Sequence, residues 1–155
     1  MANSVAEYLR MFYELHRKEL FAYAAALTGN QAAAEDAIHE AFARMLARPE
    51  LPREPRPYIF RCVRNAVIDE FRRSAREVEH AQAAAAPPGN GHAHLDLREA
   101  LAVLNEEERD TITLKIYGGL TFSEISLLRE TSLNTVASWY RRGLGKLRAH
   151  LEKET

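Results

Sequence analysis

Apolar residues recur every three or four positions along most of the chain, which is the spacing of one face of an α-helix. One such repeat occupies residues 8–27 and stops at the glycine and asparagine of 29–30, and a second occupies about residues 31–48. A proline-rich connector follows over residues 49–57, where a helix cannot continue. A third repeat over residues 57–73 starts at a proline, which suits the first turn of a helix. The first half of the chain is therefore predicted to form three helices.

The helical pattern is lost over residues 77–94, where a run of alanines is followed by Pro87-Pro88-Gly89. We interpret this stretch as a flexible linker, which spans up to about 60 Å when it is extended. It divides the chain into a first module at residues 1–76 and a second module at residues 95–155. The predicted fold is all-α, with two small helical modules.

The second module ends in two helices that are separated by a tight turn. Thr121-Phe-Ser-Glu124 is a capping box, in which two side chains satisfy backbone amides at the start of a short helix. A turn at residues 129–131 follows, and Ser132 caps a longer helix whose first turns are polar. Two helices, the second of them capped by Asn105, precede this pair. The order of elements predicts a helix-turn-helix, a motif that places its second helix in the major groove of DNA.

The composition is that of a globular protein, with 46% hydrophobic and 28% charged residues in a chain of 155. No apolar stretch is long enough to cross a membrane, and the first ten residues do not resemble a secretion signal. The single cysteine, Cys62, excludes an intramolecular disulfide, which suits a reducing compartment. We therefore expect a cytoplasmic protein without membrane insertion.

The formal net charge is −1, but the charges are segregated along the chain. Residues 53–76 hold seven arginines against three acids, and residues 129–148 hold five basic residues against one acid. The stretch between them, residues 77–110, holds eight acids against two arginines. Because attraction to phosphates is screened beyond about 10 Å, two basic patches favour contact with a polyanion at two places. The pattern also allows the modules to pack together in the free protein, with the acidic linker shielding the arginines.

Catalytic chemistry is not indicated by any motif. Cys62 lies within an apolar helical repeat, and the six histidines are scattered. His92 and His94 form only a weak metal-binding pattern, and there is no phosphate-binding glycine loop or nucleophile elbow. We expect no enzyme activity, no metal and no other cofactor.

Two sets of segments carry a resemblance to a known family: AEDAIHEAF at 34–42, YIFRCVRNAVIDEFRR at 58–73, LNEEER at 104–109, YGGLTFSEI at 117–125, SLNTV at 132–136 and RGLGKLR at 142–148. Together they resemble the extracytoplasmic-function (ECF) sigma factors of bacterial RNA polymerase, the smallest type of the sigma-70 family. The resemblance implies a region 2 three-helix bundle and a region 4 helix-turn-helix, without region 3 between them. It also implies promoter-directed transcription initiation. The partners expected from it are core RNA polymerase (its β′ clamp and β flap), promoter DNA and an anti-sigma factor, whose existence is open.

The resemblance also assigns residues to each contact. The polymerase-binding residues are Glu35, Asp36, His39 and Glu40. Those for the −10 element are Tyr58, Arg61, Arg64, Asn65, Arg72 and Arg73. Those for the −35 element are Thr121, Ser132, Asn134, Thr135, Ser138, Trp139, Arg141, Arg142 and Lys146. The chemistry agrees, because cations beside aromatic rings suit unstacked single strands, and asparagine, serine, threonine and arginine suit base edges in the major groove.

Several positions depart from the usual family pattern, including His39 where glutamine is common, Tyr58 where tryptophan is common, and Glu130 at a turn position where glycine is usual. Trp139 is equally compatible with packing in the core and with contact to DNA. Two other functions stay open at this point. One is a stand-alone helix-turn-helix regulator. The other is an adaptor that mimics a sigma factor and sequesters an anti-sigma protein, although the basic face of the last helix disfavours it.

Overall fold

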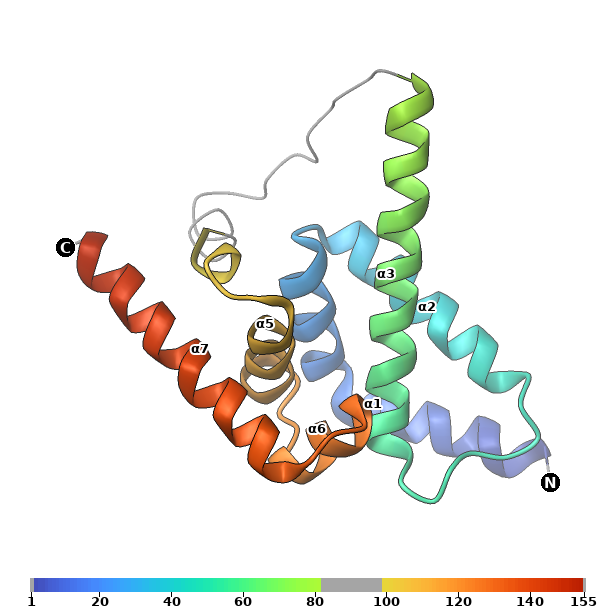
Figure 1. Cartoon of the computed structure of the whole chain (residues 1–155). Helices are drawn as coiled ribbons and strands as arrows, with labels where there is room; N and C mark the ends of the chain where they lie inside the picture. The colour runs from blue at the N-terminus through green and yellow to red at the C-terminus, as the bar shows by residue number, and fades with distance from the viewer. Residues whose placement is uncertain (1, 82–98, 155) are drawn as a thin grey trace.

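The computed structural model describes residues 2–81 and 99–154, and these residues are arranged as helices joined by short turns (Figure 1). The elements are α1 (Ala2–Thr28), α2 (Gln31–Leu46), α3 (Pro55–Ala81), α5 (Glu106–Ile112), the π-helical turn η1 (Thr113–Tyr117), α6 (Phe122–Arg129) and α7 (Leu133–Glu154). A short helical segment at 99–102 precedes α5. The all-α prediction is therefore confirmed. Among the described helices, none is long and apolar enough to cross a bilayer.

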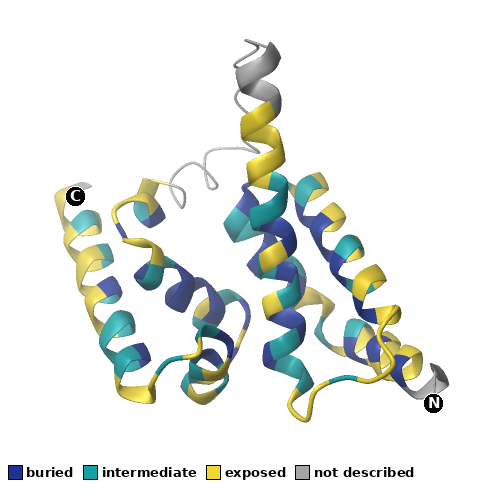
Figure 2. Ribbon diagram, turned by 45° about the vertical axis from the view of Figure 1, so that its right-hand side comes forward, coloured by how far each residue is buried: buried dark blue, intermediate teal, exposed yellow. Residues whose placement is uncertain are grey.

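The first module consists of α1, α2 and α3, as the apolar repeats predicted. Gly29, with a φ of 69°, ends α1, and the Asn30 side chain accepts hydrogen bonds from the amides of Ala32 and Ala33 to start α2. The third helix differs from the prediction, because it continues beyond residue 73 to Ala81. Arginine, glutamate and alanine are good helix formers and sustain the helix where no core requires it. Its end projects beyond the other helices, and residues 71–76 are exposed (Figures 1 and 2).

The second module keeps the predicted order of helices, with one local change. Asn105 caps α5 through reciprocal hydrogen bonds with Glu108, as in a capping box. The helix then widens into η1 instead of continuing regularly, and the Gly118 amide donates to the Thr113 carbonyl at 3.1 Å. Apolar spacing alone does not distinguish a π turn from a regular one, so this change could not be predicted from the sequence.

The two modules share one hydrophobic core. Tyr23 and Phe60 of the first module and Leu114, Leu120 and Ile125 of the second are all fully buried in the same cluster. The buried faces of the helices turn toward one another where the modules meet (Figure 2). The two modules thus pack directly, as the charge pattern allowed. The linker that was expected to shield the arginines lies largely outside the described residues.

A smaller cluster attaches α7 to α5. Leu101, Leu104 and Ile112 are buried there, with Tyr140, Leu144 and Leu147 of α7 packed against them. Gly143 of α7 is buried against α5. A β-carbon at this position would come within 2.5 Å of Ile112 Cδ1 and 3.4 Å of Glu108 Cβ. A β-carbon at Gly145, two residues further on, would have no neighbouring atom within 4 Å.

These two glycines provide a matched test of the α5–α7 contact. Gly143→Ala should lower the free energy of unfolding by about 1–2 kcal/mol, because the added methyl overpacks a buried isoleucine. Gly145→Ala should raise it by about 0.5–1 kcal/mol, because alanine is the better helix former. Urea unfolding followed by circular dichroism measures both. Equal effects of the two substitutions would show that α7 does not pack on α5 in this way.

Candidate functional site

The helix-turn-helix predicted from the sequence is present in full. Thr121 and Glu124 form the capping box of α6, and the Thr135 amide donates to Ser132 Oγ at 3.1 Å at the start of α7. Glu130 occupies the turn in the left-handed conformation, with a φ of 53°. The turn geometry is thus the one that glycine usually supplies, adopted here by a glutamate.

The first turns of α7 present polar side chains to solvent. Asn134, Arg141 and Arg142 are exposed, whereas Thr135 and Ser138 are half-buried. The opposite face of the helix is apolar, and Val136 is fully buried. The predicted base-reading residues therefore lie on or beside the open face of the helix.

Trp139 packs mainly within the protein. Its ring is half-buried against the shared core, and the guanidinium carbon of Arg129 lies 5.5 Å from the ring centroid. This cation–π contact joins the two helices of the motif. Packing therefore accounts for the tryptophan without any contact to DNA.

Lys146 is also engaged within the protein. Its ammonium donates to Glu108 Oε1 at 2.7 Å, and the Glu108 side chain is only 1% exposed. Burial alone would raise the pKa of the Glu108 carboxyl. The hydrogen bonds from Lys146 and from the Asn105 amide outweigh burial and hold that pKa below its usual value. Lys146 thus ties α7 to α5 in this structure.

The predicted −10 residues of α3 fall into two groups. Asn65, Arg72 and Arg73 are exposed, and Arg73 pairs with carboxylates of its own module. Arg61 and Arg64 instead point at the second module, where they pair with Glu130, Glu106 and Asp110. Tyr58 is half-buried under the guanidinium of Arg48, whose carbon is 5.4 Å from the ring centroid.

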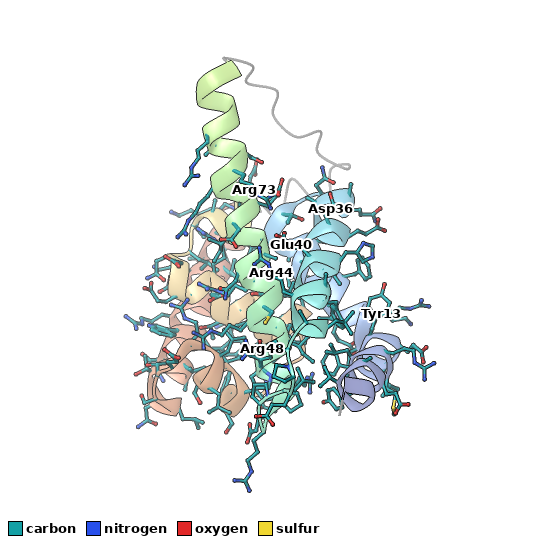
Figure 3. All side chains as sticks on the ribbon, turned by 90° about the vertical axis from the view of Figure 1, so that its right-hand side faces the viewer. Tyr13, Asp36, Glu40, Arg44, Arg48 and Arg73 are labelled. Atoms are coloured by element: carbon teal, nitrogen blue, oxygen red, sulfur yellow. The ribbon has the colours of Figure 1, made fainter. Side chains whose placement is uncertain are left out.

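The predicted polymerase-binding residues lie on the outer face of α2. Glu35, Asp36 and His39 are exposed, and Ile38 of the same helix is fully buried. Glu40 differs, because it pairs with Arg44 at 2.6 Å and with Arg73 at 3.4 Å (Figure 3). Its carboxylate is therefore part of the packing between α2 and α3.

Sequence reasoning missed a buried charge at the contact between the two modules. Asp110, 6% exposed, accepts from Arg64 Nε at 2.8 Å and from Arg129 Nη1 at 2.9 Å, with the Tyr23 hydroxyl 3.4 Å away. Burial raises the pKa of Asp110, against the opposing effect of the two guanidiniums. Burial and the neighbouring carboxylate also raise the pKa of Tyr23 well above its usual value. The only signal in the sequence was an acid four residues before the buried Leu114, on the same side of a helix.

The cysteine has an unreactive environment. Cys62 is half-buried in α3, and burial raises the pKa of its thiol despite the arginines nearby. A thiol of this kind ionises less readily than a free one, which is the opposite of what a nucleophile needs.

Comparison with known proteins identifies both halves of the chain. The family model for sigma-70 region 2 matches residues 12–77, and that for sigma-70 region 4 matches residues 94–147. The chain is 32% identical over 166 residues to the ECF RNA polymerase sigma factor SigL of Mycobacterium tuberculosis, covering 98% of this chain and 93% of that protein. It is 30% identical over 143 residues to the ECF RNA polymerase sigma factor EcfG of Rhodopseudomonas palustris, covering 85% and 78% of the two chains.

Solved structures agree in fold. The sigma factor RpoE of Bartonella quintana, in complex with the anti-sigma factor NepR, matches with a TM-score of 0.72 at 22% identity, over 93% of this chain and 96% of that one. CnrH, in complex with the cytosolic domain of CnrY, matches with a TM-score of 0.73 at 20% identity, over 99% and 94%.

Two sigma-70 regions in this order define a transcription initiation factor that directs RNA polymerase to promoters. Within that class, the chain belongs to the ECF sigma factors. A stand-alone regulator would not carry region 2 over its first half, so the family match disfavours that alternative.

The ion pair between Lys146 and Glu108 can be tested by substitution. Lys146→Met should lower the free energy of unfolding by about 1–2 kcal/mol at neutral pH, because it leaves a buried carboxylate unpaired. Arg141→Met, an exposed control on the same helix, should change it by less than about 0.5 kcal/mol. Because the folded pKa of Glu108 is depressed, the stabilising pair is present above the unfolded pKa and is lost as pH falls through the folded one. Urea unfolding at neutral and at acidic pH should show the difference between the variants shrinking in acid.

Proposed function

We propose that the first module binds core RNA polymerase through α2 and holds the opened −10 element along α3, while α7 reads the −35 element as duplex DNA. The observation that carries this proposal is the division of α7 into a buried apolar face and an exposed polar face at its capped start. The helix N-terminus there suits phosphates, and the asparagine and arginine side chains suit base edges. The chain contributes binding energy, not covalent chemistry.

The acidic face of α2 supports the polymerase contact. Glu35 and Asp36 are exposed carboxylates that form no ion pair within residues 2–81 and 99–154. Glu40, by contrast, pairs with arginines of its own module. Exposed acids at helical spacing suit a partner helix that carries arginines. We assign that partner to the β′ clamp of the polymerase, and we assign the β flap to the second module.

The end of α3 supports the single-strand contact. Arg72 is exposed on the projecting part of the helix, and Asn65 lies exposed further back on it. Strand binding needs cations along the backbone and flat surfaces for bases, and Tyr58 adds a partly exposed ring. We therefore propose α3 as the helix that binds the −10 element. The proposed modules are residues 1–76 and 95–155, with residues 77–94 as the linker.

The family also suggests how this chain is regulated and where it acts. The neighbouring structure of RpoE contains the anti-sigma factor NepR, and that of CnrH contains the cytosolic domain of CnrY. We propose that this chain also has a protein antagonist of the anti-sigma kind, and that it acts in the cytoplasm, where the polymerase is.

Reversing one charge on α2 tests the polymerase contact. Purified chain with core RNA polymerase should give promoter-specific run-off transcripts, and Asp36→Lys should reduce them by about tenfold or more, since like charges at an interface cost several kcal/mol. Glu14→Lys, an equal change on the exposed surface of α1, should leave them unchanged. Glu40→Lys is a poor choice, because it would break two internal ion pairs. A folded protein that gives no transcript across a genomic promoter library would refute the proposal.

Duplex binding tests α7 separately. Arg142→Ala or Asn134→Ala should weaken binding to a −35 duplex by about 1–3 kcal/mol and relax its sequence preference. Arg141→Ala should weaken binding equally for all sequences and reduce its dependence on salt. Lys153→Ala, at the far end of the same helix, should have little effect. Fluorescence anisotropy with duplexes from transcribed promoters measures each, and equal losses for all four variants would argue against base reading by α7.

A further inference from the structure

Lys146 lies in line with the residues of α7 that are assigned to the −35 duplex. Thr135, Arg142 and Lys146 are seven and then four residues apart, a spacing that places them along one side of a helix. Arg142 is exposed, and the Lys146 side chain is 46% exposed. From its position on the helix alone, Lys146 would be expected to contact a phosphate beside the same groove as Arg142.

The ammonium of Lys146 is bound instead by a buried carboxylate of α5. Nζ donates to Glu108 Oε1 at 2.7 Å, and the Glu108 side chain is only 1% exposed. The same oxygen accepts a hydrogen bond from the Asn105 amide at 3.1 Å, within the capping box of α5. The carboxylate is therefore fixed in place from its own helix, and Lys146 is the partner that reaches it from α7.

Glu108 keeps its negative charge in spite of its burial. Burial raises the pKa of this carboxyl, but the hydrogen bonds from Lys146 and the Asn105 amide outweigh it, together with the positive charges of Lys146 and Arg142. The pKa of Glu108 is thus held below its usual value. At neutral pH the carboxylate is charged, and it neutralises the cation above it.

We propose that Glu108 limits the DNA affinity of the second module: it neutralises Lys146 and keeps this cation from a phosphate beside α7. The inference rests on the proposed function, because it assumes that α7 lies along a −35 duplex. Glu108 itself does not touch the DNA. It acts through Lys146 and is in this sense a positioning residue.

The ion pair resists exchange for a phosphate contact. To bind a phosphate fully, the ammonium would have to turn away from Glu108, and the buried carboxylate would then lack its cation. A phosphate near the intact pair would meet a cation and an anion together, and their opposite fields largely cancel. A neutralised cation releases few counterions from DNA, so Lys146 should add little to the salt dependence of binding.

A limit on phosphate attraction affects all DNA sequences alike. Contacts to phosphates position a protein on DNA but carry no sequence information, whereas contacts to base edges do. With Lys146 neutralised, the base contacts proposed for Asn134 and Arg142 supply a larger part of the free energy of binding. The same pair weakens the hold of the chain on DNA that lacks a −35 element.

The conservative substitution Glu108→Gln tests the inference. It removes the charge but keeps the shape, and glutamine serves in a capping box as glutamate does. The slope of log K against log salt should become steeper by about 0.9, the value for one added phosphate contact. The gain in affinity over the parent chain should therefore grow about threefold between 200 and 50 mM salt. Fluorescence anisotropy should show this gain equally on a −35 duplex and on a scrambled duplex, since a phosphate contact reads no bases.

Two further variants show whether the gain comes from Lys146. Glu107→Gln makes the same change of charge one residue away on α5 and should leave the salt dependence as it was, because Glu107 forms no ion pair in the described part of the chain. In the double variant Glu108→Gln/Lys146→Met, the gain of Glu108→Gln should disappear. Circular dichroism confirms that each variant is folded.

A comparison in the parent background keeps the test valid if Glu108→Gln unfolds the second module. There, Lys146→Met should reduce the salt slope much less than Arg141→Ala does, although both remove one positive charge from α7. Equal reductions would overturn the inference. So would an unchanged slope in folded Glu108→Gln, or a gain that persists in the double variant.

Failure of this inference can be told apart from failure of the proposed function. If Arg142→Ala weakens binding to the −35 duplex while Glu108→Gln leaves the salt slope unchanged, only the role of Glu108 is refuted. If neither Arg142→Ala nor Arg141→Ala affects duplex binding, the assignment of α7 to the −35 element fails as well.

Discussion

A single buried carboxylate organises the contact between the two halves of this protein. Asp110 is surrounded by Arg64 and Arg129, and it lies next to the fully buried Tyr23. An isolated charge at this depth would be strongly destabilising, so each of the three side chains depends on the others for its position. Around this group the apolar residues of both modules form one continuous core. The relative orientation of region 2 and region 4 in the free chain therefore depends on a polar contact placed inside an apolar one.

The local structure of each helix was readable from the sequence, because its signals act over a few residues. Asn105, Thr121 and Ser132 cap helices as predicted, and Asn30, predicted only to end the first helix, also caps the second. The apolar repeat over residues 31–48 likewise coincides with a buried helix face, on which Ile38 lies. The end of α3 was misjudged because no packing signal marks it, and helix propensity alone carries the chain to Ala81.

The sequence alone did not predict which charged side chains form ion pairs within the protein. The basic stripe of α7 predicts phosphate contact equally for Arg141 and Lys146, yet only the structure shows that Lys146 is held by Glu108. Likewise, Glu35 and Glu40 look equivalent on a helical wheel, but Glu40 faces the arginines of its own module. Ion pairs between residues 30 or more positions apart leave no periodic pattern in a single sequence. The predicted site residues therefore include both exposed side chains and side chains engaged within the protein, and the sequence alone could not separate the two groups.

Glu130, in the turn of the helix-turn-helix, determines both the backbone conformation of the turn and an ion pair to α3. Glu130 adopts a left-handed backbone conformation that costs a non-glycine residue about 1 kcal/mol, and its side chain reaches across to Arg61. Glycine at this position would relax the backbone and make the DNA-reading module more stable on its own. It would also remove one of the carboxylates that face α3. The same substitution would thus strengthen the turn and weaken the contact between the two modules.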